Sequence, residues 1–427
     1  MKTKILGKAI AMFLVLSLIF AMPVSASNSS GYSGGIAETM LYTYLLGIKD
    51  PDGADRTSWQ TSAANSLYNI QNALIYKYTA FDSTQLLDHL ERSNFFVIHT
   101  HGNQTSLKAV NSYGGISQLR LPDIKALDSG ALSECRLAFI GACLVGAGGS
   151  TADNMVTGIY NKGARCAIGY KVSVKTTANY AMIKYFCQGI GRGDTIREAL
   201  SYADTMVLTE CNSDPGGTNS RLVLGSTGDR FTDRPTYLSI NDDSSLSVIQ
   251  LTDEQGAVIG FFDRSKVLES DDVYYERNRM TNTNFDDAIL KAYNIDTEKY
   301  ELVDRYFTED TGLWTTIFNY KINDVLTSDS IVFVQNTSED IVSFSHKNEG
   351  AFDNISVEST AINSALERLE DQLLAAQITD YSIVGQRLVL KDGELKFCYS
   401  IHRTIMCEGE EYEAVDDFYV PFFDISN

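Results

Sequence analysis

Basic residues are scarce in this chain relative to acidic ones. The 35 Lys and Arg residues stand against 55 Asp and Glu residues, which gives a formal net charge of -20 at pH 7. Such a charge repels nucleic-acid phosphates and anionic membrane surfaces, so we expect neither as a partner. No C-x-x-C pair occurs among the seven cysteines, so the sequence does not predict a zinc module.

Long apolar runs are also missing, except for one near the start of the sequence. That run, Ile10–Met22, follows three lysines and precedes the small residues Val24-Ser25-Ala26. A basic start, a short apolar core and a small-residue site are typical of a signal peptide, here residues 1–26 with cleavage near Ala26. The run is shorter than the roughly 20 residues of a membrane span. We expect a secreted, extracellular or cell-envelope protein without a stable membrane anchor; an uncleaved N-terminal anchor is the alternative.

Alternating helix and strand patterns fill residues 58–235 and predict an α/β domain. Short runs that are apolar on both faces, such as Phe95–Ile98 and Leu137–Ile140, predict strands of a mostly parallel sheet with helices on both faces. Helical spacing of apolar residues predicts further elements between them. The expected helices are 63–76, 83–90, 121–132, 151–161, 176–190 and 195–208, and residues 27–57 are left as an N-terminal segment.

After Pro235 strands dominate, and residues 236–427 predict a second, α+β domain. Helices are expected only at Asn284–Tyr293 and Thr360–Gln377. The last strands, Leu388–Tyr399 and His402–Cys407, predict a hairpin whose cysteines Cys398 and Cys407 could form a disulfide. The hinge between the domains is expected in the glycine- and aspartate-rich stretch from Ser213 to Pro235.

Two of the predicted parallel strands end in reactive residues. Phe95–Ile98 leads into His99-Thr100-His101-Gly102, and Leu137–Ile140 leads into Gly141-Ala142-Cys143. Ligands of open parallel sheets bind beyond the carboxyl ends of the strands, so a thiol and an imidazole meet there if the strands are neighbours. These two groups are the minimum for nucleophilic acyl transfer. We also expect the helix predicted to start near Ser150 to lower the pKa of the Cys143 thiol.

An apolar block ending in His-Gly, followed by one ending in Ala-Cys, resembles the caspase-like (clan CD) cysteine peptidases. The segments Ala152–Tyr170 and Gly189–Ala203 are similar to the CHAT peptidases of bacteria: a helix, Gly-Ala, a strand ending in Ile-Gly, and a later Gly-x-x-x-x-x-Ala-Leu helix. The resemblance covers roughly residues 58–230. It implies Cys143 as nucleophile, His101 as proton-transfer partner, and the backbone N–H groups of Gly102 and Cys143 as the oxyanion hole.

One stretch departs from that family pattern. CHAT-like members tend to carry an acidic residue just after the Ile-Gly strand, where it can line a pocket for a basic substrate side chain. This chain has Lys171 and Lys175 there, and we take both as candidate substrate-pocket residues. A preference for cleavage after Arg or Lys is therefore not predicted.

The second domain carries a fainter resemblance. Tyr300–Asn354, with its rhythm of strands around Tyr320-Lys321-Ile322, is similar to the PepSY-like repeats of exported bacterial proteins. Such modules are associated with restraining or positioning peptidases, which implies that the C-terminal domain could regulate this one.

Other chemistries fit the sequence less well. His99 could form a metal pair with His101, but none of the remaining histidines has ligand spacing, so no metal and no cofactor are expected. The loop Gly146–Ser150 lacks the glycine register and lysine of a phosphate loop. The Gly-x-Ser-x-Gly match at Gly31–Gly35 has no strand before it. Asp194–Glu198 is expected to open a helix, with Asp194 as cap and Glu198 on a solvated face.

The sequence thus predicts a secreted cysteine endopeptidase that hydrolyses peptide bonds of a peptide or protein substrate. A hypothesis of another class is a catalytically silent, caspase-like module that binds or regulates through its C-terminal domain. The two differ in the reactivity of the Cys143 thiol, since an activated thiolate alkylates much faster than an ordinary thiol near neutral pH.

Overall fold

The computed structural model describes most of the chain after residue 39. The described residues are 40–49, 56–70, 72–211, 220–231, 247–253, 256–267, 290–291, 295–296, 299–338, 340–348, 350–407 and 409–423. The predicted signal peptide, the Gly31–Gly35 segment and nearly all of the helix predicted at 284–293 lie outside these residues.

A six-stranded sheet forms the first half of the structure. Its order is β2-β1-β3-β7-β8-β9, and every pair is parallel except β8 with β9. Three of its strands are buried along their whole length, which explains their continuous apolar runs. The strands are β1 (Leu41–Gly47), β2 (Ala73–Tyr78), β3 (Phe95–His99), β7 (Leu137–Gly141), β8 (Cys166–Tyr170) and β9 (Arg221–Gly225).

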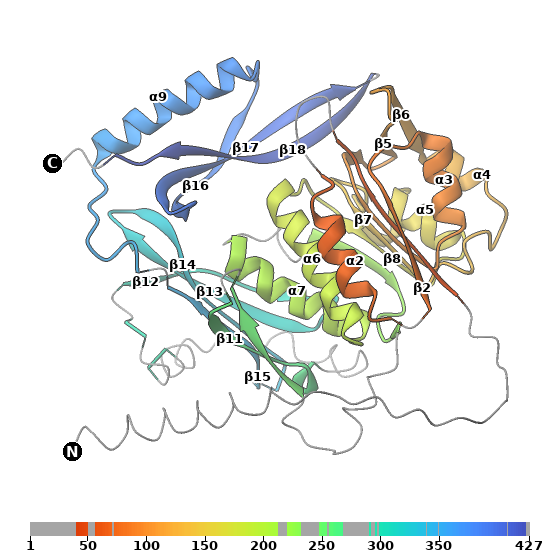
Figure 1. Ribbon diagram of the computed structural model, residues 1–427, viewed down its shortest axis with the longest axis horizontal. Helices are drawn as coiled ribbons and strands as arrows, with labels where there is room; N and C mark the ends of the chain where they lie inside the picture. Colours follow the sequence, from red (N-terminus) through yellow and green to blue (C-terminus); the bar gives the residue numbers. More distant parts are fainter. Residues whose placement is uncertain are drawn as a thin grey trace, which may run out of the picture. The chain divides into compact units, whose positions relative to one another are not determined.

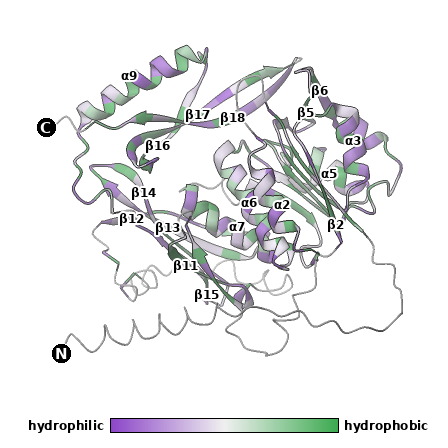
Figure 2. Ribbon diagram, in the orientation of Figure 1, coloured by the Kyte–Doolittle hydropathy of each residue, from purple (hydrophilic) through white to green (hydrophobic). Residues whose placement is uncertain are grey.

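Helices cover both faces of this sheet (Figure 1). One apolar cluster joins one face to α2, α6 and α7, and a second joins the other face to α3, α4 and α5. Figure 2 shows the strands between the helices in green, the colour of hydrophobic residues, so both faces of the sheet must be shielded from water. The α/β fold class is therefore confirmed. The helices are α2 (Trp59–Leu67), α3 (Ser83–Glu91), α4 (Leu121–Ala126), α5 (Met155–Asn161), α6 (Thr176–Gly191) and α7 (Ile196–Cys211).

The start of the sheet differs from the prediction. Strand β1 lies in the segment 27–57 that the sequence left outside the α/β domain, and it pairs with both β2 and β3. The single helix predicted at 63–76 is wrong, because α2 ends at Leu67 and the chain re-enters the sheet as β2. Asn72, between them, has the left-handed φ of 60°, which ends helical propagation.

A small antiparallel sheet follows β3 and stands beside the end of the larger one. It consists of β4 (Gly102–Asn103), β5 (Ser106–Val110) and β6 (Ile116–Arg120). The Lys108 N–H donates to the His101 carbonyl at 3.0 Å. This bond fixes the backbone on which one candidate catalytic side chain stands.

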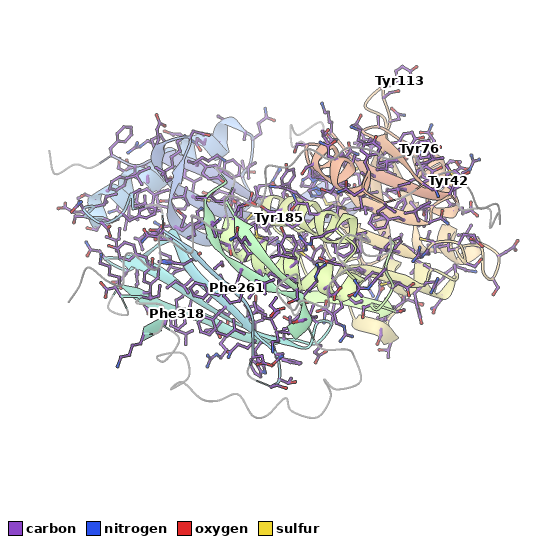
Figure 3. The ribbon with its side chains drawn as sticks, turned by 60° about the horizontal axis from the view of Figure 1, so that its bottom comes forward. Tyr42, Tyr76, Tyr113, Tyr185, Phe261 and Phe318 are labelled. Carbon is purple, nitrogen blue, oxygen red and sulfur yellow. The ribbon has the colours of Figure 1, made fainter. Side chains whose placement is uncertain are left out.

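A nine-stranded sheet and the helix Ser359–Ala375 make up most of the second half that the structure describes. Its main path is β10-β11-β15-β14-β16-β17-β18, with β12 and β13 paired to each other and β13 to β14. Phe261 and Phe318 lie on this sheet (Figure 3). The elements are β10 (Val248–Thr252), β11 (Val258–Asp263), β12 (Tyr300–Thr308), β13 (Leu313–Ile322), β14 (Val325–Gln335), β15 (Ile341–Lys347), α9 (Ser359–Ala375), β16 (Ser382–Lys391), β17 (Glu394–Cys407) and β18 (Glu410–Pro421).

The predicted C-terminal hairpin has the wrong register. The turn lies at Asp392-Gly393, with φ values of 57° and 77°, and not between Tyr399 and His402. Two central residues with positive φ form the tight turn that Asp-Gly favours. Cys398 and Cys407 consequently lie on the same strand, β17, and both are free thiols, so the suggested disulfide is wrong.

The two sheets share one apolar core through α6 and α7. Residues of the second sheet, including Phe262 and Val332, belong to the same buried cluster as the helices. Thr205 and Thr209 of α7 form hydrogen bonds with Ser343 (2.8 Å) and Ser345 of β15 (2.6 Å). Residues 40–427 accordingly form one compact unit by their contacts. The domain boundary near residue 235 stays a prediction.

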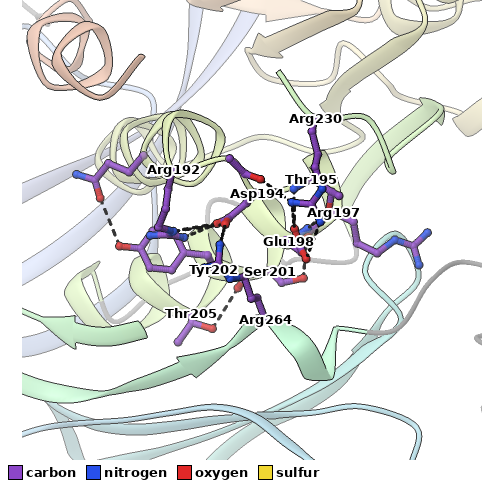
Figure 4. Close-up of polar contacts among 12 residues, drawn as sticks. Arg192, Asp194, Thr195, Arg197, Glu198, Ser201, Tyr202, Thr205, Arg230 and Arg264 are labelled. Carbon is purple, nitrogen blue, oxygen red and sulfur yellow. Dashed lines mark hydrogen bonds and ion pairs between the residues drawn. The ribbon is translucent and has the colours of Figure 1, made fainter. Parts of the chain in front are cut away.

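The turn between α6 and α7 carries a buried polar cluster (Figure 4). Asp194 is fully buried and pairs with Arg192 and, at 2.9 Å, with Arg264 beside β11. Glu198 is 8% exposed and pairs with Arg230 at 2.9 Å. The prediction of a solvated face at Glu198 is therefore wrong, because charged partners from later in the chain cover it.

The described helices include none that is both long and apolar enough to cross a membrane.

Candidate active site

His101 and Cys143 follow the ends of two neighbouring strands. Strands β3 and β7 pair in parallel, with His99 opposite Gly141, and the Thr100 N–H donates to the Gly141 carbonyl at 3.2 Å. The chain leaves both strands at the same edge of the sheet. His101 and Cys143 consequently line one cavity, together with His99.

That cavity is closed in this structure. Its volume is about 10 Å³, which is room for no more than a single water molecule. His101 is 2% exposed and Cys143 is 5% exposed. A peptide substrate therefore has no access to the thiol in this conformation.

The backbone at the cysteine is sharply turned. Leu144, directly after Cys143, has a left-handed φ of 59°, a backbone conformation that is costly for a residue with a side chain. Cys143 therefore lies at a sharp bend of the chain. The Leu144 N–H donates to the Val172 carbonyl at 3.1 Å, and the Val174 N–H donates to the Cys143 Sγ at 3.3 Å. The loop after β8 thus supports the turn.

Gly102 lies against this turn and has no room for a side chain. A Cβ at this position would come within 2.7 Å of the Val145 Cγ1 and 2.8 Å of the Ala142 Cβ. The residue type is thus set by the close approach of two segments. The oxyanion hole at Gly102 and Cys143 stays a prediction, and this approach brings the two segments into contact.

The Cys143 thiol is not activated in this conformation. Burial raises its pKa to about 11, which outweighs the hydrogen bond from Val174 and the charge of Arg56. The helix expected near Ser150 does not help, because residues 149–151 form a single 3-10 turn and α5 begins only at Met155. The expected fall in pKa is therefore wrong for the closed site.

Strand β18 from the C-terminal region covers the site. Glu413 and Ala414 line the cavity, and the Tyr412 ring lies 6.3 Å from the His101 ring. The Tyr412 hydroxyl forms a 3.1 Å hydrogen bond with the Ser106 hydroxyl, and the Asn103 amide donates to the Glu410 carboxylate at 3.2 Å. Residues of β18 therefore lie against both His101 and Cys143.

The two candidate pocket lysines differ in their position. Lys175 forms a 2.8 Å ion pair with Asp417 of β18, and the two side chains are 5% and 2% exposed. Burial alone would raise the pKa of Asp417, but Lys175 and Arg387 outweigh it and hold that pKa below its ordinary value. Lys171 lines neither this cavity nor the larger one beside Lys175.

Sequence reasoning missed Arg56 and β18. Arg56 is 2% exposed and lines the Cys143 cavity, although it lies in the segment before the predicted domain. An arginine in a polar loop has no periodic signal. The acidic pattern Glu413 to Asp417 is visible in the sequence, but nothing local indicates that it lies beside the cysteine.

The remaining predicted features have ordinary positions. Gly148 and Gly149 have φ values of 77° and 76°, a left-handed backbone conformation that glycine adopts at no steric cost. His89 stacks on Tyr78, and His346 forms a 3.0 Å hydrogen bond with Tyr300. No cluster of three or more potential metal ligands occurs among the residues that the structure describes.

Comparisons with known proteins agree with the sequence motifs. Residues 63–256 match the family model of the CHAT domain. We refer to residues 63–256 as the CHAT domain after this match. This confirms the predicted likeness to the caspase-like cysteine peptidases, while the PepSY-like resemblance stays a prediction.

No curated protein matches the chain. A solved structure, the complex of Porphyromonas gingivalis RgpB pro- and mature domains, is similar at 13% identity and a TM-score of 0.33. The match covers 51% of this chain and 59% of that one, and at this TM-score it adds nothing to the family assignment.

Proposed function

We propose that this protein is a cysteine endopeptidase in which Cys143 is the nucleophile and His101 transfers the proton. The observation that carries the proposal is their shared cavity at the ends of β3 and β7. The CHAT domain supports the same chemistry, because its relatives include cysteine peptidases. Peptides or proteins are accordingly the proposed substrates.

The reaction proceeds in two steps. His101 takes the proton of the Cys143 thiol, and the thiolate attacks the peptide carbonyl carbon. The C–N bond then breaks, and the His101 imidazolium gives that proton to the leaving amine. The backbone N–H groups of Gly102 and Cys143 stabilise the oxyanion. Water then attacks the thioester, which releases the carboxylic acid and regenerates the thiol.

The described conformation is the resting form of this enzyme. Strand β18 fills the approach to Cys143, and a buried thiol with a pKa of about 11 is almost entirely protonated at neutral pH. Activity therefore requires β18 to move away. This extends the proposal to regulation by the protein's own C-terminal region, outside the cell if the N-terminal signal is cleaved.

A cut beside β18 tests this function. A recognition sequence for a specific protease is inserted between Gly409 and Glu410, so that cleavage leaves β18 held by its pairing with β17 and its side-chain contacts alone, and the cut strand is then removed in mild urea. The cut protein should hydrolyse a peptide library, and the cut Cys143→Ala variant should not. As a control, the same sequence is inserted at Asp392-Gly393, where no side chain lies near Gly393. Turnover that survives Cys143→Ala would end the proposal.

The closed site also keeps the silent-module hypothesis open. Its supporting observation is the raised pKa of the Cys143 thiol. Alkylation of Cys143, followed by peptide mass mapping because seven thiols are present, separates the two. A peptidase should show a large rise in rate after the cut, and this rise should be lost in His101→Ala. A silent module should show the slow rate of an ordinary thiol in both.

A further inference from the structure

The start of α6 binds two consecutive carboxylates of β18. The Thr176 hydroxyl donates to Asp416 at 2.9 Å, and the Thr177 hydroxyl donates to Asp417 at 2.9 Å. Lys175, just before the helix, forms the 2.8 Å ion pair with Asp417. Three successive residues of the CHAT domain therefore recognise acidic side chains on a segment from elsewhere in the chain.

This carboxylate site adjoins the nucleophile. The Val174 N–H contacts the Cys143 Sγ at 3.3 Å, and the next residue, Lys175, pairs in parallel with Val415. Ala414 and Glu413 of the same strand line the Cys143 cavity. The acidic residues thus bind only a few positions along the strand from the point nearest the thiol.

After β8, Val172 and Ser173 line one cavity, and from Ser173 to Thr176 the residues alternate between two cavities. Val174 and Thr176 line the Cys143 cavity, whereas Ser173 and Lys175 line a second cavity of about 730 Å³. Alternate side chains of an extended segment point to opposite sides. Val415 of β18 also lines this second cavity. An extended peptide in the place of β18 would meet the same two sides.

We propose that Lys175, with Thr176 and Thr177, forms a substrate subsite that selects an acidic side chain close to the cleaved bond. Strand β18 then acts as an internal mimic of the substrate, with Asp417 in that subsite. The inference rests on the proposed peptidase function and adds its substrate class: peptides that carry Asp or Glu within a few residues of the cleavage point.

Local charge supports this class of substrate. Lys175 is 5% exposed, and a buried ammonium group is costly without a counter-charge. When β18 leaves and takes Asp417 with it, a substrate carboxylate restores the pair. Arg56 adds a positive charge inside the Cys143 cavity, and Arg387 lies 3.8 Å from Asp417. These cations dominate locally over the net charge of the chain, which salt screens beyond about 10 Å.

The test uses the full chain with the protease site between Gly409 and Glu410, after cleavage. Matched peptides differ only in Asp against Asn, or Asp against Lys, at each position near the cleavage point. At one position we expect kcat/KM to be about tenfold or more higher for Asp than for Asn. Lys175→Met should abolish this ratio and Lys175→Glu should shift it toward the Lys peptide, whereas Lys171→Met, on the same loop, should retain it.

A binding measurement keeps the inference testable if no peptide is turned over. A fluorescent peptide with the sequence Glu410–Pro421 is added to the cut Cys143→Ala variant, and its affinity is compared with that of the peptide carrying Asp417→Asn. We expect about a tenfold loss, and no difference between the two peptides with Lys175→Met. Turnover without any acidic preference, or equal binding of both peptides, overturns the subsite. The first result also demonstrates the peptidase function, and the second leaves that function untouched.

Discussion

The Tyr412 ring of β18 lies 6.3 Å from the His101 ring, although the two residues are separated by most of the chain. Tyr412 is fully buried, and its hydroxyl forms a hydrogen bond with Ser106 in the sheet beside His101. This contact joins the covering strand to the candidate catalytic histidine. Substitutions at Tyr412 can therefore test what keeps the site closed.

We expect Tyr412→Ala to loosen the cover. Removal of a buried aromatic ring destabilises a protein by about 3–5 kcal/mol, and here much of the lost contact lies between β18 and the CHAT domain. Cys143 should alkylate faster, as measured by mass mapping at pH 8. Tyr399→Ala is the control, because Tyr399 is equally buried but lies on β17 in the core under α9. Equal acceleration by both variants would indicate general unfolding and contradict a specific role for Tyr412.

Tyr412→Phe should have a much smaller effect. It keeps the ring and removes only the hydrogen bond to Ser106, which is worth about 1 kcal/mol. Urea unfolding should show this modest loss, and the alkylation rate of Cys143 should stay close to that of the wild type. A rise in the alkylation rate as large as that of Tyr412→Ala would show that the hydrogen bond, rather than the packing of the ring, keeps the site closed.

Asp417→Asn should destabilise the closed form strongly. It leaves the Lys175 charge buried and weakly compensated, which costs about 3–5 kcal/mol. Asp416→Asn is the matched control, because Asp416 binds Thr176 and Arg403 in a more exposed position and should cost less. Thermal unfolding measures both. Similar losses in the two variants would contradict the central role of Lys175.

Moderate acid should not open the site through Asp417. Its pKa is held below the ordinary value of 3.8, so its contribution to the closed form is complete above that value. The contribution is lost only as the pH falls through the lower pKa of the closed state. Alkylation is too slow to follow in acid, so protection of β18 from hydrogen exchange is the measurement. If β18 lost its protection between pH 7 and pH 5 in the wild type but not in Asp417→Asn, this prediction would be wrong.

Alkaline pH should weaken the closed form through Cys143. Burial raises the pKa of its thiol to about 11, so the closed state binds this proton more tightly than an open state does. The stabilisation is complete below the ordinary value of 9.0 and is lost as the pH rises toward 11. The free energies of unfolding of wild type and Cys143→Ala, plotted against pH, should converge in this range. Parallel curves would contradict the raised pKa of Cys143.

Gly102→Ala should displace the two catalytic segments. The new Cβ would overlap Val145 and Ala142, and such overpacking costs about 1–3 kcal/mol. We expect turnover by the cut protein to fall more than its stability does. Gly228→Ala is the control, since open space surrounds that position. Unchanged kcat/KM in Gly102→Ala would show that the close approach is not needed for catalysis.

The sequence alone determined the α/β class, β3 and β7, and the positions of His101 and Cys143 at their ends. Continuous apolar runs between polar stretches are local signals, and parallel strands deliver whatever follows them to one edge of the sheet. The Asp392-Gly393 turn was an equally local signal, but the predicted strand Leu388–Tyr399 ran across it. The prediction left β1 outside the α/β domain, because the pairing of this strand with its neighbours is visible only in three dimensions.

Only the tertiary structure decided that the site is closed. The pairing of Lys175 with Asp417, and of His101 with Tyr412, joins residues with hundreds of others between them, and no local pattern encodes such contacts. The same holds for the pKa of Cys143, which burial raises whereas the sequence suggested a fall. Reactive residue types are written in the sequence, but their burial, and hence their charge, is set by what the rest of the chain packs against them.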